Sequence, residues 1–513
     1  LLTFRSDGSG NYEEGDLPDD LKDQIDQKHE ELIELIAESD DTLLEKFFDE
    51  GGLSEEELRS GLHDAILNGS VIPLVATSAQ KNVGVSRLLD LIIKYCPSPK
   101  DFPGVKAKNF RSGDEVTIAP SNDQPACLLV FKTVSEPHVG ELSFFRVYSG
   151  SVKSGMDLKN TTRQSSERLG QVFSMNGKNR KDAGILNAGD IGAVVKLKNT
   201  HTGDTLCDQR LDAQLPKIDF PPPSIHEAVV TKSKGDEEKI AMGLATLHEE
   251  DPTFVYHVDS ELKQTIISGL GELQLEVVVD RLKSKFSVEV DLIEPRVPYR
   301  ETVKGNGNSK YRHKKQSGGA GQFAEVWMKI EPKGRGDGVE FSNSLVGQNV
   351  DRVFVPSVEK GVNAACAEGV LAGYRVVDLK VDFYDGKQHP VDSKDVAFQI
   401  AGRGAFKEAF MNAKPCLLEP IMVIEVKVPE DQMGDVMGDI SGRRGKILGM
   451  DTDGGFQVIR AQLPQANLYR YSTTLRSLTG GRGTHSEQFS HYEYMPGDMQ
   501  KKVIAKSSKE DEE

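Results

Sequence analysis

Two segments of the chain combine glycines, amides and cations in a way that suits contact with a nucleic acid. The first is a glycine-rich loop that directly follows Lys314 and Lys315, and its candidate residues are Gln316, Ser317, Gly318, Gly319, Gly321 and Gln322. Glycine lets a backbone approach a phosphate closely, and neighbouring cations attract that phosphate. The second loop, residues 384–393, carries Lys387, His389 and Asp392. By pattern alone, a solvated hairpin tip explains the first loop equally well, and a lone loop histidine is usually solvated.

A third basic segment, residues 441–446, contains Arg443, Arg444 and Lys446 near the predicted end of a helix. Such a turn could contact a nucleic acid. Cations at a helix C-terminus also interact favourably with the helix dipole, so the segment has a purely structural interpretation as well.

Catalytic and metal-binding patterns are absent from the sequence. It contains no HExxH, GxSxG or GxxxxGK[ST] motif, and its histidines are scattered without ligand spacing. The five cysteines lie far apart with no CxxC pair, which argues against zinc and favours a reducing cytoplasm. We therefore expect no catalytic residue and no metal site in this chain.

The charge of the chain is distributed unevenly along its 513 residues. The net charge is −17, but residues 1–64 hold 21 Asp and Glu against 5 Lys and Arg. Residues 65–508 are close to neutral, so the overall charge does not exclude a nucleic-acid partner. The acid in residues 1–64 indicates either a solvated helical face or a docking surface for a basic partner. No apolar run is long enough to span a membrane.

Periodicity divides the chain into several structural units. Residues 1–103 predict a helix from Leu21 to Phe48, a second helix from Glu55 to Leu67 capped by Ser54, a strand at 71–76 and a last helix ending at Tyr95. Residues 104–223 show the short alternating runs of a β-barrel, and 224–295 and 419–488 each predict the ferredoxin-like split-βαβ order. Residues 296–418 mix strands and helices, and 507–513 form an acidic tail that we expect to be disordered.

Several stretches occur in an order that resembles elongation factor G, the ribosomal translocase of the translational GTPase family. They are residues 144–150 and 202–207 in the barrel, 250–254 and 265–273 in the third domain, 299–302 and 316–322 in domain IV, 442–445 in domain V and 489–493 after it. The resemblance implies a multidomain α/β and α+β fold in which residues 296–418, with 489–506, form an elongated arm.

The resemblance also assigns roles to the front of the chain. Ser78, Ala79 and Gln80 resemble the last guanine-reading loop of a GTPase domain, and the acidic helices resemble an insert within that domain. We interpret residues 1–103 as the C-terminal remnant of such a domain, and the first methionine, Met156, as a sign of N-terminal truncation. The family uses GTP with Mg²⁺. We expect neither bound to this chain, and no GTP hydrolysis by it, because the phosphate loop is missing.

For the remaining candidates the resemblance implies contacts on the ribosome. The two tip loops would touch tRNA and mRNA at the small-subunit decoding region, while Lys314, Lys315, Arg443, Arg444 and Lys446 would touch ribosomal RNA, partly on the large subunit. The acidic insert would face basic stalk proteins. We expect a cytoplasmic monomer, without membrane contact, that moves tRNA and mRNA during elongation.

Departures from the family pattern, at residues 387–390, Gln274 and 484–488, predict a divergent paralogue. The alternatives are a ribosome recycling paralogue, a tetracycline-type ribosomal protection protein, or a binding protein that works without nucleotide.

Overall fold

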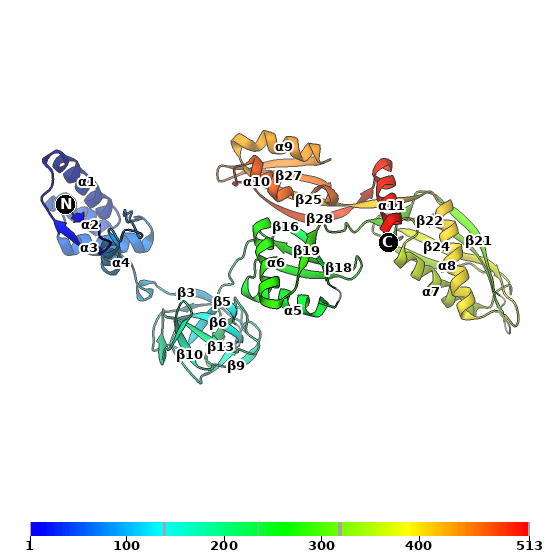
Figure 1. Ribbon diagram of the computed structural model, residues 1–513, viewed down its shortest axis with the longest axis horizontal. Coiled ribbons are helices and arrows are strands. Elements are labelled where there is room, and N and C mark those ends of the chain that lie inside the picture. The colour runs from blue at the N-terminus through cyan, green and yellow to red at the C-terminus, as the bar shows by residue number, and fades with distance from the viewer. Residues whose placement is uncertain (1, 137–139, 234, 316–320, 511–513) are drawn as a thin grey trace. The chain divides into compact units, whose positions relative to one another are not determined.

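The computed structural model describes residues 2–136, 140–233, 235–315 and 321–510, with side chains described up to residue 507. The chain divides into two compact units, one of Leu1–Asp219 with Glu249–Pro252 and one of Phe220–His248 with Thr253–Glu513. Both units mix helices with mainly antiparallel sheets, which confirms the predicted multidomain α/β and α+β fold class (Figure 1). Within the described ranges, no helix is long and apolar enough to cross a membrane.

The first 103 residues are mainly helical. Their elements are β1 (Leu2–Phe4), β2 (Tyr12–Glu14), α1 (Asp19–Ala37), α2 (Asp41–Glu50), α3 (Glu55–Asn68), α4 (Val85–Tyr95) and η1 (Pro99–Asp101). The prediction of a single helix from Leu21 to Phe48 is wrong, because the helix is interrupted between α1 and α2. The Asp40 side chain accepts hydrogen bonds from the backbone N–H groups of Thr42 and Leu43, which stabilises a new helix start.

The strand predicted at residues 71–76 is not formed. Val71 is buried, but the side chains of Ile72 and Leu74 are 87% and 96% exposed. A β-strand is stable only where neighbouring strands satisfy its backbone and cover its side chains. No strand of the described chain pairs with this segment, so its apolar sequence is not enough to make it a strand.

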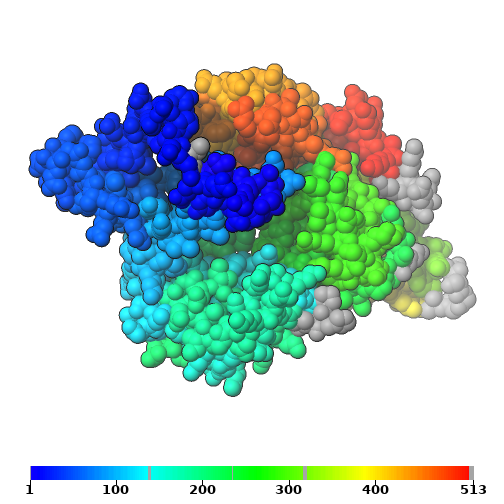
Figure 2. All heavy atoms as spheres, turned by 60° about the vertical axis from the view of Figure 1, so that its left-hand side comes forward, coloured from blue at the N-terminus to red at the C-terminus, as the bar shows by residue number. Residues whose placement is uncertain are grey.

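Residues 105–214 form antiparallel sheets around a common core. An eight-stranded sheet, in the order β11-β10-β13-β6-β5-β14-β8-β9, is joined by the sheets β12-β7 and β15-β3-β4. The strands are β3 (Val105–Asn109), β4 (Glu115–Ile118), β5 (Cys127–Glu136), β6 (Gly140–Ser149), β7 (Ser151–Lys153), β8 (Asp157–Asn160), β9 (Ser165–Arg168), β10 (Val172–Asn176), β11 (Asn179–Asp182), β12 (Ile185–Asn187), β13 (Ile191–Val195), β14 (Thr205–Cys207) and β15 (Ala213–Gln214). In the space-filling view these residues, cyan to teal, are closely packed (Figure 2).

The second unit begins with a four-stranded antiparallel sheet in the order β17-β18-β16-β19. Its elements are β16 (Ile225–Thr231), α5 (Glu237–Glu250), β17 (Val255–Asp259), β18 (Gln264–Gly269), α6 (Glu272–Phe286) and β19 (Val290–Ile293). This β-α-β-β-α-β order with its strand arrangement is the predicted split-βαβ plan.

The same plan recurs near the C-terminus, where β26, β27 and β25 pair in that order and β28 pairs with β25. Its elements are β25 (Pro415–Pro429), η3 (Glu430–Gln432), α9 (Met433–Gly442), β26 (Lys446–Asp453), β27 (Phe456–Pro464), η4 (Gln465–Asn467), α10 (Tyr471–Leu478) and β28 (Thr484–Tyr494). The first residues of the long β25 also pair with β20 (Arg300–Val303). The strand β25 therefore connects this sheet to β20, which directly precedes β21 in the sequence.

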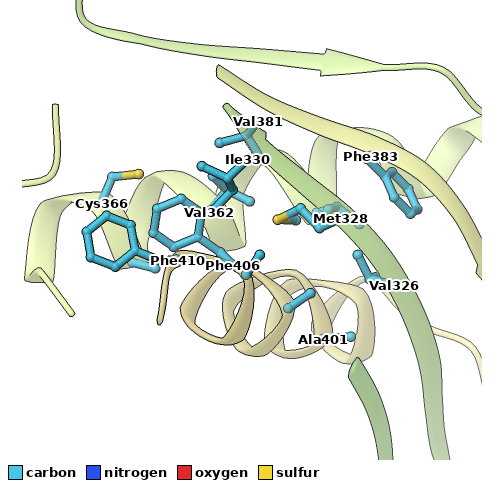
Figure 3. Packing of buried hydrophobic residues seen from close by; sticks show 14 of the residues in the cluster. Val326, Met328, Ile330, Val362, Cys366, Val381, Phe383, Ala401, Phe406 and Phe410 are labelled. Carbon is cyan, nitrogen blue, oxygen red and sulfur yellow. The ribbon is translucent and has the colours of Figure 1, made fainter. Parts of the chain in front are cut away.

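The remaining layer is a four-stranded sheet, β21-β22-β24-β23, with two helices on one face. Its elements are β21 (Gly307–Lys315), β22 (Gln322–Pro332), β23 (Val339–Asn343), η2 (Arg352–Phe354), α7 (Val355–Glu368), β24 (Leu379–Lys387) and α8 (Asp395–Asn412). Every second residue of β22, from Ala324 to Ile330, is buried against the helices, where Phe406 and Phe410 project from α8 (Figure 3). Alternation therefore places the other residues of β22 on the opposite face.

The chain continues past β28 into α11 (Gly497–Glu510). Residues 507–510, which we expected to be disordered, belong to this helix, and the Ser507 hydroxyl donates to the carbonyl of Ala372. Residues 511–513 lie outside the described residues. The tertiary contact of Ser507 explains why polar composition alone misjudged the end of this helix.

Candidate nucleic-acid interface

The two loops proposed for nucleic-acid contact are joined at one end of the β21-β22-β24-β23 sheet. The Gly321 N–H donates to Asp392 Oδ1 at 2.9 Å, and the Phe323 N–H donates to the Asp392 carbonyl at 2.9 Å. The Ser393 hydroxyl donates in return to the Phe323 carbonyl at 2.8 Å. A Cβ at position 321 would lie 3.2 Å from Asp392 Cγ, so a side chain there would require Asp392 to shift slightly. Gln316, Ser317, Gly318 and Gly319 lie outside the described residues, so their roles stay predictions.

His389 is half-exposed and held at this junction. Its ring meets Phe323 edge-on, with ring centres 6.2 Å apart. Its Nδ1 accepts the N–H groups of Val391 and Asp392, each at 3.3 Å. Asp392 Oδ2 lies 3.5 Å from the same Nδ1. Nε2 is the ring nitrogen that these contacts leave for a ligand.

Three of the candidate cations lie on the strands that lead into these loops. Lys314 and Lys315 end β21 and are exposed, opposite Phe323 and Gln322 of β22. Lys387 ends β24 opposite Glu325 and is exposed. The Gln322 amide oxygen lies 3.0 Å from His313 Nε2, so part of its hydrogen-bonding capacity is used within the protein. The described part of this edge therefore combines three lysines, an amide and an imidazole.

The basic turn at residues 443–446 is engaged mainly within the protein. Arg443 donates to Asp439, to the Asn467 carbonyl and to Thr474 at 2.8, 2.9 and 3.0 Å. Arg444 makes a two-pronged contact with the buried carboxylate of Glu419, at 2.5 and 3.0 Å. Lys446 is exposed at the start of β26. Ribosomal RNA contact by this turn stays a prediction, for which Lys446 is the best placed of the three cations.

The segment from Ser78 to Val83 forms a tight loop ahead of α4. Ser78 and Val83 exchange backbone hydrogen bonds at 3.0 Å in both directions, and Ala79 and Gln80 are exposed. Such a loop can present backbone groups to a base, but it has no glycine-rich cradle for phosphates. The described residues also hold no group of three or more His, Cys, Asp or Glu side chains that could bind a metal ion. That this chain holds neither GTP nor Mg²⁺ stays a prediction.

Comparison with known proteins identifies the family. Family models match residues 125–209 as Elongation factor G domain 2, 220–294 as Elongation Factor G, domain III, 295–414 as Elongation factor G, domain IV, and 416–503 as Elongation factor G C-terminus. The chain is also similar to the crystal structure of ttk003000868 from Thermus thermophilus, with 32% identity and a TM-score of 0.77. That similarity covers 98% of this chain and 73% of the other.

The chain belongs to the elongation factor G family. Elongation factor G membership gives the chain an elongation-factor-like role in translation and implies interaction with the ribosome. It also names the layer that carries the two joined loops as domain IV of elongation factor G.

Sequence reasoning found the loops but missed two features of the site. Asp392 and Ser393 act mainly as the ties between the loops, which a sequence cannot reveal because their partners lie about 70 residues away. The second missed feature is the placement of Lys314, which the sequence shows only as one of several basic residues before the glycine-rich loop. The alternation of Lys310, Arg312 and Lys314 is the signal that could have placed these cations on one face of a strand.

Proposed function

We propose that the chain acts in ribosomal translocation, with the joined loops of domain IV contacting tRNA and mRNA at the decoding region. The observation that carries the proposal is the pairing of Gly321 and Phe323 with Asp392 and Ser393, which fixes the described end of the first loop to the second loop. A fixed edge can hold a shifted tRNA–mRNA pair, because donors already in place lose little entropy when they engage a ligand. Cytoplasmic localisation and a monomeric state belong to this proposal.

GTP hydrolysis in this proposal needs residues other than those of this chain. The sequence contains no GxxxxGK[ST] motif, and the Ser78–Gln80 loop supports only a contact to the guanine base. The translocation assays therefore use a protein that also carries the phosphate-binding residues.

The test of the proposal is replacement of His389 by alanine. The change removes Nε2, the edge contact to Phe323 and the Nδ1 acceptor of two loop N–H groups, while the ties through Asp392 and Ser393 remain. We expect single-round translocation to slow roughly 10- to 100-fold, because misplacement of a contacting group by about 1 Å has effects of that size. Ribosome binding should change less than about threefold, and Lys360→Ala on the exposed side of α7 is the matched control. Equal losses of binding and translocation would speak against late contact by this edge.

A second prediction concerns the acidic helices, which we propose to face basic stalk proteins. Glu55 and Glu56 are exposed in the first turn of α3, whereas Glu57 completes a capping box with Ser54 and pairs with Lys46. The hydrogen bonds from Lys46 and from Ser54 lower the pKa of Glu57 to about 2. A charge-reversal test must therefore spare Glu57, since its loss would also disrupt the helix start.

The informative variant is Glu55→Lys with Glu56→Lys. We expect stalk-dependent stimulation to fall severalfold at low ionic strength and the defect to shrink at high salt, because surface charges are screened. Glu237→Lys with Glu238→Lys is the matched control, since these exposed acids occupy the same first-turn positions in α5. An equal response of both pairs, or none in either, would favour a merely solvated acidic face.

A further inference from the structure

The outer face of the domain IV sheet carries aromatic rings between cations. The inner face of β22 packs against α7 and α8, as Figure 3 shows for Val326, Met328 and Ile330. On the opposite face, the register pairs Lys310 with Trp327 and Arg312 with Glu325. The side chains of Lys310, Arg312, Lys314 and Lys329 are exposed there, and those of Trp327 and Tyr384 are partly exposed.

Aromatic rings hold two of these lysines in place. Lys310 Nζ lies 3.7 Å from the centre of the Trp327 ring, and Lys329 Nζ lies 4.7 Å from the centre of the Tyr384 ring. The two rings meet edge to face, with centres 6.1 Å apart. A cation above an aromatic face is attracted by the ring's electrons but keeps its hydrogen-bond donors for a further partner.

Two carboxylates near these lysines, Glu325 and Asp382, are already engaged, the latter by the hydroxyls of Ser342 and Ser344, whereas Glu331 is exposed toward the end of β22. Glu325 is 6% exposed and accepts hydrogen bonds from Trp327 Nε1 at 2.9 Å and Arg312 Nε at 2.5 Å. Burial acts to raise the pKa of Glu325, but these two hydrogen bonds and the nearby cations outweigh it and lower the pKa. Asp385 accepts from the Asn349 amide and from the Gly386 N–H. No salt bridge involves Lys310, Lys314 or Lys329 within the described part of the chain.

We propose that this outer face binds single-stranded RNA, with its phosphates along Lys310, Lys314 and Lys329 and an unstacked base on Trp327 or Tyr384. Alternate residues of β21 lie about 6.7 Å apart, so the strand presents a regular row of charges rather than a point. When a phosphate draws Lys310 away, the ring of Trp327 becomes available to a base. Aromatic rings between cations favour a single strand over a duplex, since only unpaired bases can be splayed onto a ring. The surface adjoins the tip loops at Lys314 and extends away from them to Lys310 and Lys329, and its use on the ribosome rests on the proposed function.

The single tryptophan of the chain makes this surface directly observable. Titration of the chain with a 12-nucleotide oligouridylate should change Trp327 emission in a saturable way. Anisotropy of the labelled oligonucleotide then gives the affinity of each variant. The test variant is Lys310→Gln with Lys314→Gln and Lys329→Gln, which spares Arg312 because Arg312 neutralises the buried Glu325.

We expect the triple variant to bind at least tenfold more weakly and its salt dependence, as the slope of log K against log salt, to be shallower by about 2. The control removes three other exposed lysines, Lys360, Lys501 and Lys502, by the same replacement and should bind less than threefold more weakly. The proposal would be overturned if both triple variants lost affinity equally, or if the oligouridylate bound without changing Trp327 emission. It would also be overturned if a duplex or polyglutamate bound as tightly as the oligouridylate, or if the oligouridylate did not bind. The His389→Ala assay tests the tip loops separately, because that variant leaves Lys310, Lys314 and Lys329 in place.

Discussion

Replacement of Glu301 by glutamine is expected to lower the free energy of unfolding of domain IV by about 3–5 kcal/mol. Glu301 is fully buried on β20, and its carboxylate accepts the backbone N–H groups of Val370, Leu371, Ala372 and Tyr374 at 2.7–3.1 Å. A glutamine keeps the shape but replaces one oxygen by an NH₂ donor, which then faces two N–H donors. Buried donors left without an acceptor carry the full cost of their desolvation.

Urea denaturation followed by Trp327 emission measures this effect, because Trp327 lies on the sheet whose core includes Val303 from the same β20. Glu331→Gln is the matched control, since Glu331 is exposed near the end of β22. A loss below about 1 kcal/mol, in the range of ordinary surface substitutions, would contradict the role of Glu301 as a buried anchor.

Replacement of Arg444 by alanine should cost about 3 kcal/mol of stability in the C-terminal sheet, because it leaves the Glu419 carboxylate buried and unpaired. The Glu419 side chain is 4% exposed, and the hydrogen bonds to it raise the pKa of Arg444. Thermal unfolding of the variant, compared with Lys446→Ala, separates the two interpretations of this turn. If Arg444 only contacts RNA, the Arg444→Ala variant should have normal stability and weakened ribosome binding. The buried contact with Glu419 predicts instead that the variant loses stability. Lys446→Ala should change stability by less than about 0.5 kcal/mol.

The parts that the sequence predicts well are those determined by local periodicity. Residues 395–412 repeat buried alanine and phenylalanine at helical spacing, and α8 has those bounds. Ser54 with Glu57 predicts the start of α3, because a capping box involves only neighbouring residues.

The failures arise where distant partners decide the outcome. The apolar segment at 71–76 lacks a paired strand, and residues 507–510 remain helical next to a contact with Ala372. Arg444 looked like a free cation because Glu419 lies 25 residues away in the sequence. The contact between Lys310 and Trp327 could not be predicted either, because it depends on how β21 and β22 pair with each other.

In the proposed function, the joined loops of domain IV contact tRNA and mRNA during translocation. Single-round translocation by the full-length protein, measured beside ribosome binding for His389→Ala and Lys360→Ala, tests it most directly. We expect His389→Ala alone to slow translocation roughly 10- to 100-fold, with ribosome binding nearly unchanged. A full-length protein that moves no tRNA but splits post-termination ribosomes together with a recycling factor would contradict it and support the recycling alternative.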